Sequence, residues 1–355
     1  MTSPENLEPD YGFEKGLNVR VLDHTNGGEH SLHVDHATLK ALMDSETDES
    51  SEERLQEQLL KPQVGYGEHA MGRTAVEFCV VGPEDASDVM YALYGWGGDL
   101  RHDVAINELK KLSKRFKDKQ IVVVNTPGTG RSELLSRSLS KQISKEGDYS
   151  GYGELVAGAT RSIVDGKNVH IRGHSLGART AIAATPYIEG GVDSLIINDP
   201  TGARRMNLGQ LAWRYVVKEN MHLRQYIRHA FDPEAARLQG RPISAAMKKT
   251  LDGAKGSKRH LVLVDPKGLR HETLEESLYD AAPNVRNVLR VVVPEMSELS
   301  DWRDIDRIIA RVRGYADVDA DTSVETWVLK GHTHSWMTAA PSIEALLYDE
   351  KIQAS

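Results

Sequence analysis

The feature that most constrains the fold is a short alternating run of residues that ends in a serine between two glycines. Residues 168–172, Asn-Val-His-Ile-Arg, alternate apolar and polar side chains as a half-buried strand does. Gly-His-Ser-Leu-Gly follows at 173–177, and the alanine-rich segment 178–184 then indicates a closely packed helix. The glycines two positions before and after Ser175 permit the strained backbone of a sharp strand-to-helix turn. The turn is therefore expected to hold the Ser175 hydroxyl clear of the sheet.

A serine in this position suits nucleophilic catalysis. The backbone N–H of Leu176 would face a developing oxyanion, because the first N–H groups of a helix have no partner within the helix. A serine hydroxyl is a weak nucleophile at neutral pH, so it also needs a base within hydrogen-bond distance and a third group that orients the base. The structural alternative is that Ser175 only caps the helix.

The rest of the chain indicates the fold class. From about residue 75, apolar strands alternate with amphipathic helices, which predicts an α/β fold with a mostly parallel sheet and helices on both faces. The predicted strands are 75–81, 88–94, 120–125, 168–172, 193–198, 288–293 and 322–329, and the predicted helices are 104–116, 152–163, 302–312 and 336–348. Residues 201–285 break the alternation with several helical segments (208–230, 242–251 and 273–281). We expect this helical insertion to lie over the carboxyl edge of the sheet.

Four motifs make the chain resemble the α/β-hydrolase fold family over about residues 75–350. Residues 94–98, Tyr-Gly-Trp-Gly-Gly, resemble the family's oxyanion loop, with a tyrosine where a histidine is usual. Residues 125–132, Asn-Thr-Pro-Gly-Thr-Gly-Arg-Ser, resemble its Asp-x-Pro-Gly-x-Gly-x-Ser loop, with an asparagine in place of the aspartate. Residues 173–177 match its nucleophile elbow, and Gly-His-Thr-His at 331–334 resembles the loop that carries the catalytic histidine.

The resemblance implies roles for individual residues. Ser175 would be the nucleophile and His334 the base, with His332 as the second choice for the base. The backbone N–H groups of Leu176 and Trp96 would bind the oxyanion.

No sequence motif identifies the acid that orients the base. In the family it usually follows the strand before the last helix, and that position falls here on Ser297. We predict Glu298, because its extra methylene lets a glutamate one residue later reach the same point. Glu295 and Asp301 in the same loop stay open, as does Asp199 after the preceding strand, a position that some family members use. The structural alternative for Glu295 and Glu298 is that they are first-turn acids of the next helix.

Charge is unevenly distributed along the 355 residues, whose net charge is −8. Residues 1–60 carry 14 acidic and 4 basic side chains, whereas residues 201–270 carry 5 acidic and 15 basic ones. We therefore expect an acidic N-terminal extension at 1–74 with room for edge strands, an α/β-hydrolase core at 75–200 and 286–355, and a basic helical cap at 201–285.

These observations predict a serine hydrolase that cleaves an ester or thioester of a small-molecule acyl substrate through an acyl-serine intermediate. Acyl transfer to another acceptor, or cleavage of a carbon–carbon or amide bond, stays open with the same triad. A non-catalytic binding protein also stays open, because Tyr94, Asn125 and Ser297 depart from the family's pattern. The basic cap suits an anionic acyl substrate, or else the acidic extension neutralises it within one chain or across a homo-oligomer. The negative net charge argues against nucleic acid as a partner.

Several other classes are disfavoured. No apolar run approaches the roughly 18 residues of a membrane span, and the N-terminus lacks the apolar region of an export signal. Cys79 is the only cysteine, so no internal disulfide can form, and we expect a cytoplasmic protein. We expect no cofactor, because residues 128–133 lack the third glycine of a dinucleotide fingerprint and no phosphate-binding loop occurs. We expect no metal site, since His332 and His334 have no further ligands nominated by the sequence.

Overall fold

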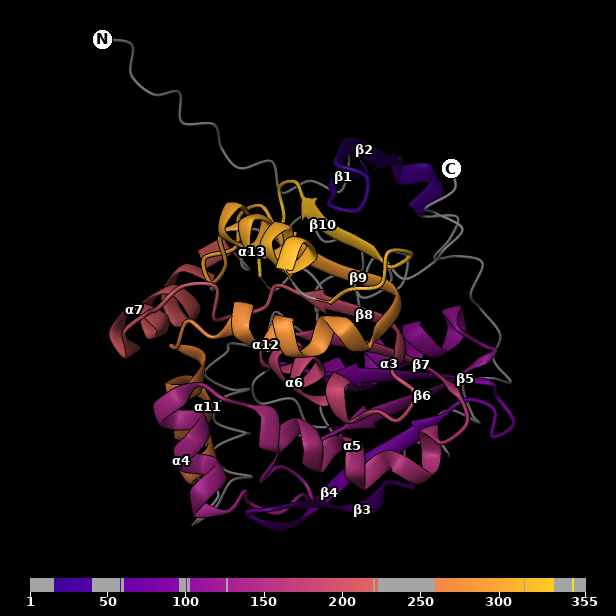
Figure 1. Cartoon of the computed structure of the whole chain (residues 1–355), viewed down its shortest axis with the longest axis vertical. Coiled ribbons are helices and arrows are strands. Elements are labelled where there is room, and N and C mark those ends of the chain that lie inside the picture. The colour runs from indigo at the N-terminus through magenta and orange to yellow at the C-terminus, as the bar shows by residue number, and fades with distance from the viewer. Residues whose placement is uncertain are drawn as a thin grey trace.

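A ten-stranded sheet runs through the computed structural model, which describes residues 16–39, 58, 61–95, 100, 103–125, 127–219, 221–222, 259–315, 317–334 and 347. Its strand order is β2-β1-β10-β9-β8-β7-β5-β6-β4-β3 (Figure 1). The strands are β1 (Leu17–Asp23), β2 (Gly28–Val34), β3 (Gln63–His69), β4 (Gly72–Val81), β5 (Asp88–Leu93), β6 (Lys119–Val124), β7 (Asn168–His174), β8 (Val192–Asn198), β9 (Val285–Pro294) and β10 (Ser323–Leu329).

The six central strands, from β10 to β6 in the sheet order, all run parallel. The outer strands pair antiparallel, β1 and β2 beside β10 and β4 and β3 beside β6. The prediction of a mostly parallel sheet is therefore confirmed, and each of the seven predicted strands is present.

The helical elements are α3 (Asp103–Arg115), α4 (Arg137–Glu146), α5 (Ser150–Val164), α6 (Leu176–Ala184), η2 (Thr185–Tyr187), α7 (Leu208–Ala212), η3 (Trp213–Lys218), α11 (Arg259–Leu269), α12 (Leu274–Ala281), η5 (Ala282–Asn284) and α13 (Trp302–Tyr315).

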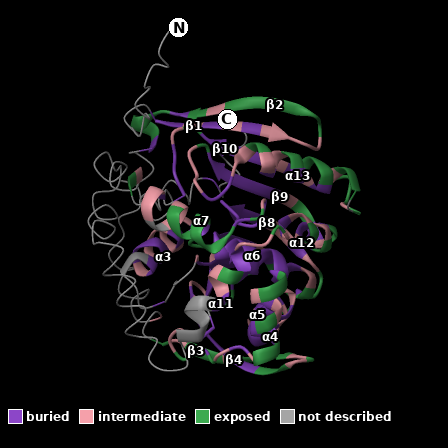
Figure 2. Ribbon diagram, turned by 90° about the vertical axis from the view of Figure 1, so that its left-hand side faces the viewer, coloured by how far each residue is buried: buried purple, intermediate pink, exposed green. Residues whose placement is uncertain are grey.

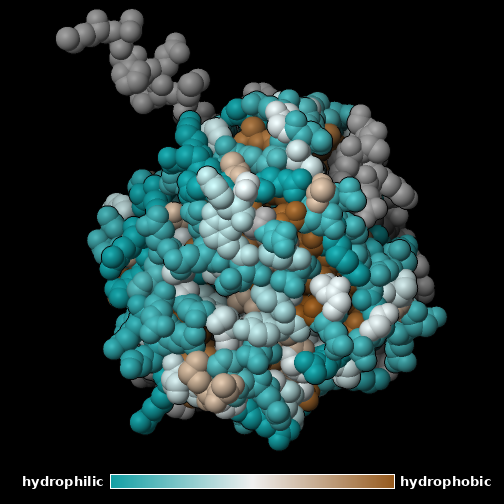
Figure 3. Space-filling view, in the orientation of Figure 1, coloured by the Kyte–Doolittle hydropathy of each residue, from teal (hydrophilic) through white to brown (hydrophobic). Residues whose placement is uncertain are grey.

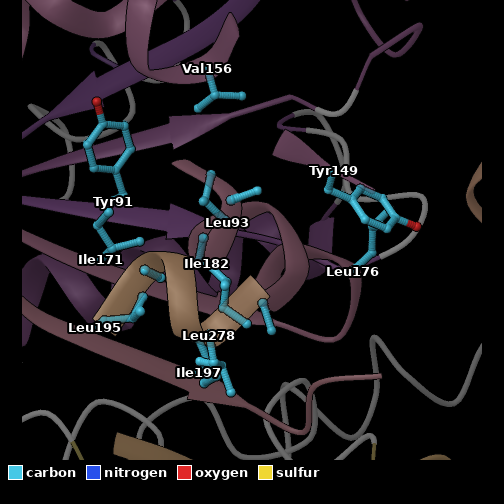
Figure 4. Packing of buried hydrophobic residues seen from close by; sticks show 14 of the residues in the cluster. Tyr91, Leu93, Tyr149, Val156, Ile171, Leu176, Ile182, Leu195, Ile197 and Leu278 are labelled. Atoms are coloured by element: carbon cyan, nitrogen blue, oxygen red, sulfur yellow. The ribbon is translucent and has the colours of Figure 1, made fainter. Parts of the chain in front are cut away.

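Two hydrophobic cores lie on opposite faces of the sheet, because successive strand residues point to opposite sides. In β5, Val89, Tyr91 and Leu93 belong to one core, whereas Met90 and Ala92 belong to the other. The first core packs against α5, α6, α12 and α13, and Figure 4 shows strand and helix side chains of this cluster meeting. The second core packs against α3. Figure 2 shows the buried strands between partly exposed helices, so both faces of the central sheet are covered.

Residues 1–74 contribute edge strands to the sheet. β1 and β2 form one edge and β3 the other, and β2 is almost entirely exposed. β3 lies under α5 at very short range: a Cβ atom on Gly65 would come 2.0 Å from the carbonyl oxygen of Ala159, and one on Gly67 would come 2.1 Å from that of Leu155. These two glycines are thus required by the close approach of the helix backbone.

The predicted insertion, 201–285, contains two kinds of helix. α7 and the π-helix η3 follow β8 and lead toward the site described below, and α11 packs against α4. α12, which the sequence placed in the insertion, instead packs against α6 and α13 as the crossover helix between β8 and β9. The predicted helix at 242–251, and the predicted helix at 336–348 apart from Leu347, lie outside the described residues.

The molecular surface is mostly hydrophilic on the face shown in Figure 3, with smaller hydrophobic areas between. None of the helices in the described part of the chain has the length and apolar character that crossing a bilayer requires.

Candidate active site

Ser175 occupies a strained turn between β7 and α6. Its backbone angles are φ 55° and ψ −114°, which an L-residue rarely adopts. A Cβ atom on Gly173 would lie 2.3 Å from the carbonyl oxygen of Gly177, and one on Gly177 would lie 2.1 Å from that of Leu93. The two glycines therefore let the turn close on itself and against β5. This is the sharp strand-to-helix turn that the spacing of residues 173–177 predicts.

The turn lies where the direction of the sheet connections reverses. After β5 the chain passes through α3 to β6 on one side, and then returns to β7 on the other side of β5. In open α/β sheets, the crevice at the carboxyl ends of two such strands is the usual place for a ligand. Gly95, just after β5, faces Ser175 across this crevice, since a Cβ atom on Gly95 would lie 3.3 Å from the Ser175 Cβ.

His334 follows β10 and is held by a buried carboxylate. Its Nδ1 lies 2.6 Å from Oδ2 of Asp199, the residue that follows β8, and both side chains are almost fully buried. Burial pulls the pKa of His334 down, but the charge and hydrogen bond of Asp199, with a further contribution from Glu219, hold it above its ordinary value of 6.5. The imidazole is thus oriented by Asp199 and stabilised in its charged form.

His174 joins the serine turn to the histidine loop. Burial, together with the nearby charges of His334 and Arg172, holds the pKa of His174 well below 6.5. Its Nε2–H donates to the carbonyl oxygen of His334 at 3.1 Å, and the two ring centroids are 4.7 Å apart. Since His174 immediately precedes Ser175, this contact brings the serine turn and the imidazole to the same side of the molecule.

The prediction of Glu298 as the orienting acid does not match this geometry. No hydrogen bond or ion pair within the described ranges connects Glu298 to His334. Glu298 instead accepts hydrogen bonds from Lys218 Nζ at 3.1 and 3.2 Å, with His222 Nε2 at 3.5 Å. The side chain is therefore turned toward the segment after α7. The acid beside His334 is Asp199, which the sequence had left as an alternative.

The remaining acids of the loop after β9 have other roles. Glu295 Oε2 accepts the backbone N–H of Gly331 at 3.1 Å and so supports the start of the histidine loop. Asp301, which directly precedes α13, accepts the backbone N–H of Arg303 through Oδ1 and so caps the start of that helix. Ser297, at the family's usual acid position, donates from Oγ to Asp199 Oδ2 at 2.5 Å.

Glu219 is a site residue that the sequence did not indicate. It follows η3, is almost fully buried, and accepts the backbone N–H of Glu298 through Oε1 at 2.8 Å. Burial raises its pKa to about 7, an effect that the charge of His334 opposes. Tyr215, four residues earlier, contacts the His334 ring edge-on with centroids 5.9 Å apart. A lone glutamate in a basic helical segment carries no pattern that would have marked it.

No protein-family model and no curated protein matches the sequence. Solved structures do match, at low identity. A thermophilic esterase from Thermogutta terrifontis is 13% identical with a TM-score of 0.51, covering 83% of this chain and 98% of its own. A putative aryl esterase from Burkholderia cenocepacia is 13% identical with a TM-score of 0.54 and the same coverage. A putative lipase from Acinetobacter baumannii AYE is 14% identical with a TM-score of 0.53, covering 87% of this chain and 98% of its own.

The chain has the α/β-hydrolase fold. Its departures from the motifs of that fold have local explanations. Asn125 donates from Nδ2 to the buried carboxylate of Glu77 at 2.7 Å and accepts the backbone N–H of Leu100 at 2.8 Å. An aspartate at position 125 would set a second buried carboxylate against Glu77. Tyr94 uses its hydroxyl to bind the carbonyl oxygen of Ala105 in α3.

Of the other predicted site residues, the structure describes Leu176 and His332 but not Trp96. Leu176 is the first residue of α6, where a backbone N–H has no helical partner. Trp96 lies outside the described residues. His332 is buried, which lowers its pKa to about 3, and its carbonyl oxygen accepts the N–H of Met296. In the part of the chain that the structure describes, no group of three or more His, Cys, Asp or Glu side chains is arranged to hold a metal ion.

Proposed function

We propose that this protein is a serine hydrolase that cleaves carboxylic esters, with Ser175 as nucleophile, His334 as general base and Asp199 as the orienting acid. The observation that carries the proposal is the hydrogen bond between His334 Nδ1 and Asp199 Oδ2 at 2.6 Å, on a histidine tied through His174 to the strained serine turn. This arrangement has the three roles that serine hydrolysis needs. Structural neighbours that are named as an esterase, a putative aryl esterase and a putative lipase agree with the proposal.

The chemistry follows from these roles. Ser175 Oγ attacks the ester carbonyl carbon while His334 Nε2 takes the hydroxyl proton, and Asp199 stabilises the imidazolium. The tetrahedral intermediate collapses as His334 protonates the leaving oxygen, which releases the alcohol and leaves an acyl-serine. Water then attacks the acyl carbon with His334 again as base, and the carboxylic acid departs with Ser175 regenerated.

The developing oxyanion would be bound by two backbone N–H groups, those of Leu176 and Trp96. Leu176 suits this role because it begins α6 directly after the nucleophile. Gly95, whose Cα lies against Ser175, leads directly to Trp96. Removing one such donor typically costs about 3 kcal/mol of barrier.

The charges near the site favour a neutral acyl substrate over an anionic one. Arg214 donates to the backbone carbonyl oxygen of Glu298 at 2.8 Å and Lys218 binds the Glu298 carboxylate, so both cations already have partners within the protein, and Lys218 is paired with an acid. Glu219 and Asp199 add negative charge beside His334. The basic residues between 223 and 258 lie outside the described ranges.

A fluorophosphonate probe tests the proposal directly. Such a probe phosphonylates a serine only when the serine is activated, so we expect stoichiometric labelling of the peptide that contains Ser175 and loss of p-nitrophenyl acetate hydrolysis. Ser175→Ala and His334→Ala should abolish both signals, while Ser297→Ala, which changes a neighbouring serine, should still be labelled at Ser175. Absence of labelling in the wild-type protein between pH 6 and 9 would overturn the proposal and favour a binding protein.

Two further measurements separate hydrolysis from acyl transfer and ester cleavage from thioester cleavage. Product analysis in the presence of added alcohols or amines distinguishes water from another acceptor. Comparison of phenyl acetate with phenyl thioacetate gives the preferred leaving atom.

A further inference from the structure

Glu219 has one carboxylate oxygen that the protein does not use. Oε1 accepts the backbone N–H of Glu298, whereas Oε2 is fully buried and has no hydrogen-bond partner among the described residues. Leaving a buried acceptor unpaired is unfavourable, so such an atom calls for an explanation. Glu219 is not needed for the triad, because Asp199 already occupies Nδ1 of His334.

Glu219 lies beside the imidazole that would protonate the leaving group in the proposed mechanism. Glu219 and Tyr215 belong to the same segment, η3 and its C-terminal cap, and Tyr215 contacts the His334 ring directly. In the mechanism above, His334 delivers a proton to the alcohol oxygen, so the groups beside the imidazole face the alcohol part of the ester.

We propose that Glu219 is a specificity-determining residue whose free oxygen binds a hydroxyl group on the alcohol part of the substrate. The inference rests on the proposed function and names its substrate class: esters of diols and other polyhydroxy alcohols. A hydroxyl suits Glu219 better than an ammonium group, because a cation there would oppose the imidazolium that forms on His334. An alcohol carrying a carboxylate would be repelled by Glu219, Asp199 and Glu298.

The local structure fixes Glu219 for this role. Its segment is bound to the loop after β9 at three points: Arg214 to the carbonyl oxygen of Glu298, Lys218 to the Glu298 carboxylate, and Glu219 itself to the Glu298 N–H. η3 is a π-helix, a rare form that occurs often at functional sites. With Oε1 held, Oε2 has little freedom and is preorganised for one donor.

Two esters that differ by a single group test the inference. Propyl butyrate and 2-hydroxyethyl butyrate have the same acyl group and nearly the same size, and 2-methoxyethyl butyrate adds polarity without a donor. We expect wild-type kcat/KM, measured by pH-stat at pH 8, to favour the hydroxyethyl ester over the propyl ester by about tenfold or more. In Glu219→Leu this ratio should fall to about one, and in Glu219→Gln, which keeps an acceptor oxygen, it should be intermediate. Glu298→Gln removes the neighbouring negative charge, but its amide oxygen can still accept from Lys218 and its N–H still holds Glu219, so this variant should retain the wild-type ratio.

The ratio of two substrates on one enzyme preparation is independent of the folded fraction, so a purely structural role of Glu219 leaves it unchanged. A wild-type ratio near one, or equal ratios in the wild type and Glu219→Leu, overturns the inference and fits a buried water on Oε2. An equal preference for the methoxyethyl ester also overturns it, since an ether has no hydrogen to donate. If neither ester is hydrolysed and Ser175 is not labelled by the fluorophosphonate, it is the proposed function that fails.

Discussion

Replacing Asp199 by asparagine isolates the electrostatic part of the proposed catalysis. Asp199 Oδ2 accepts two hydrogen bonds, from His334 Nδ1 and from Ser297 Oγ. An asparagine amide oxygen can accept both, so Asp199→Asn keeps the shape and the donors of the site. What it removes is the negative charge that stabilises the imidazolium.

The size of the effect follows from the geometry. At an N···O distance of 2.6 Å and an effective dielectric constant of about 20, a unit charge pair interacts by about 6 kcal/mol. The amide oxygen retains a neutral hydrogen bond, so we expect a loss of about 4–5 kcal/mol in the transition state. This corresponds to a decrease in kcat of about 10³- to 10⁴-fold.

The direction of the pH effect provides a second readout. Asp199 contributes to the raised pKa of His334, so its removal lowers that pKa. The neutral imidazole is the active base, and it then persists to lower pH. The acidic limb of the pH–rate profile should therefore move to lower pH while the plateau falls.

The assay is hydrolysis of p-nitrophenyl acetate from pH 5 to 9, with circular dichroism to verify folding. Glu298→Gln is the matched control, because it neutralises a carboxylate in the loop after β9 that forms no hydrogen bond or ion pair with His334 in the described part of the chain. The half-buried ion pair of Glu298 with Lys218 contributes little free energy, so we expect less than about a fivefold change in kcat. Wild-type-like activity in Asp199→Asn, or a loss in Glu298→Gln as large as that expected for Asp199→Asn, would refute the reasoning.

Three further predictions follow from buried groups. In the wild type, kcat/KM should fall as the pH drops through the pKa of His334, which lies above 6.5, and a pH–rate profile with a midpoint well below 6.5 would contradict this. Asn125→Asp should lower the free energy of unfolding in urea by about 2–3 kcal/mol at pH 8 and by less at pH 5. The new carboxyl would form a buried pair with Glu77 whose pKa is raised in the folded state, so the repulsion between the two carboxylates disappears once the pair binds a proton at lower pH. Equal losses at both pH values would exclude this cause. Arg172→Met should cost about 3–5 kcal/mol by leaving the buried carboxylate of Glu108 without its cation, and adding Glu108→Gln should recover much of the loss.

The central sheet could be predicted from the sequence because its strands are buried on both faces and are therefore almost continuously apolar. In β6 every residue after Lys119 is buried, and in β9 the last six residues are buried. β2 and β3 could not be predicted, since β2 is exposed and β3 carries two glycines that belong to the contact with α5. In these strands, neighbouring elements rather than local composition determine the structure.

The serine turn and the histidine were predictable because the geometry of each demands particular residues next to each other in the chain. The acid was not, because a carboxylate needs no special neighbours. β8 and β9 are adjacent parallel strands, with Asn198 opposite Val292, so the loops after both strands reach the same place. Asp199 and Glu298 were therefore both compatible with the sequence, and only the packed loops distinguish them.

The departures from the family's motifs are better understood as paired changes than as signs of lost function. Where the usual acid position holds Ser297, the carboxylate of Asp199, which follows the neighbouring strand β8, lies at His334 Nδ1 and accepts a hydrogen bond from Ser297. Where the usual loop aspartate is Asn125, the buried carboxylate of Glu77 on β4 lies opposite and binds its amide. In both places the negative charge is kept and only the residue that carries it has moved. A chain that had lost catalysis would not need to keep a charged acid at the imidazole, so these pairs favour an active enzyme.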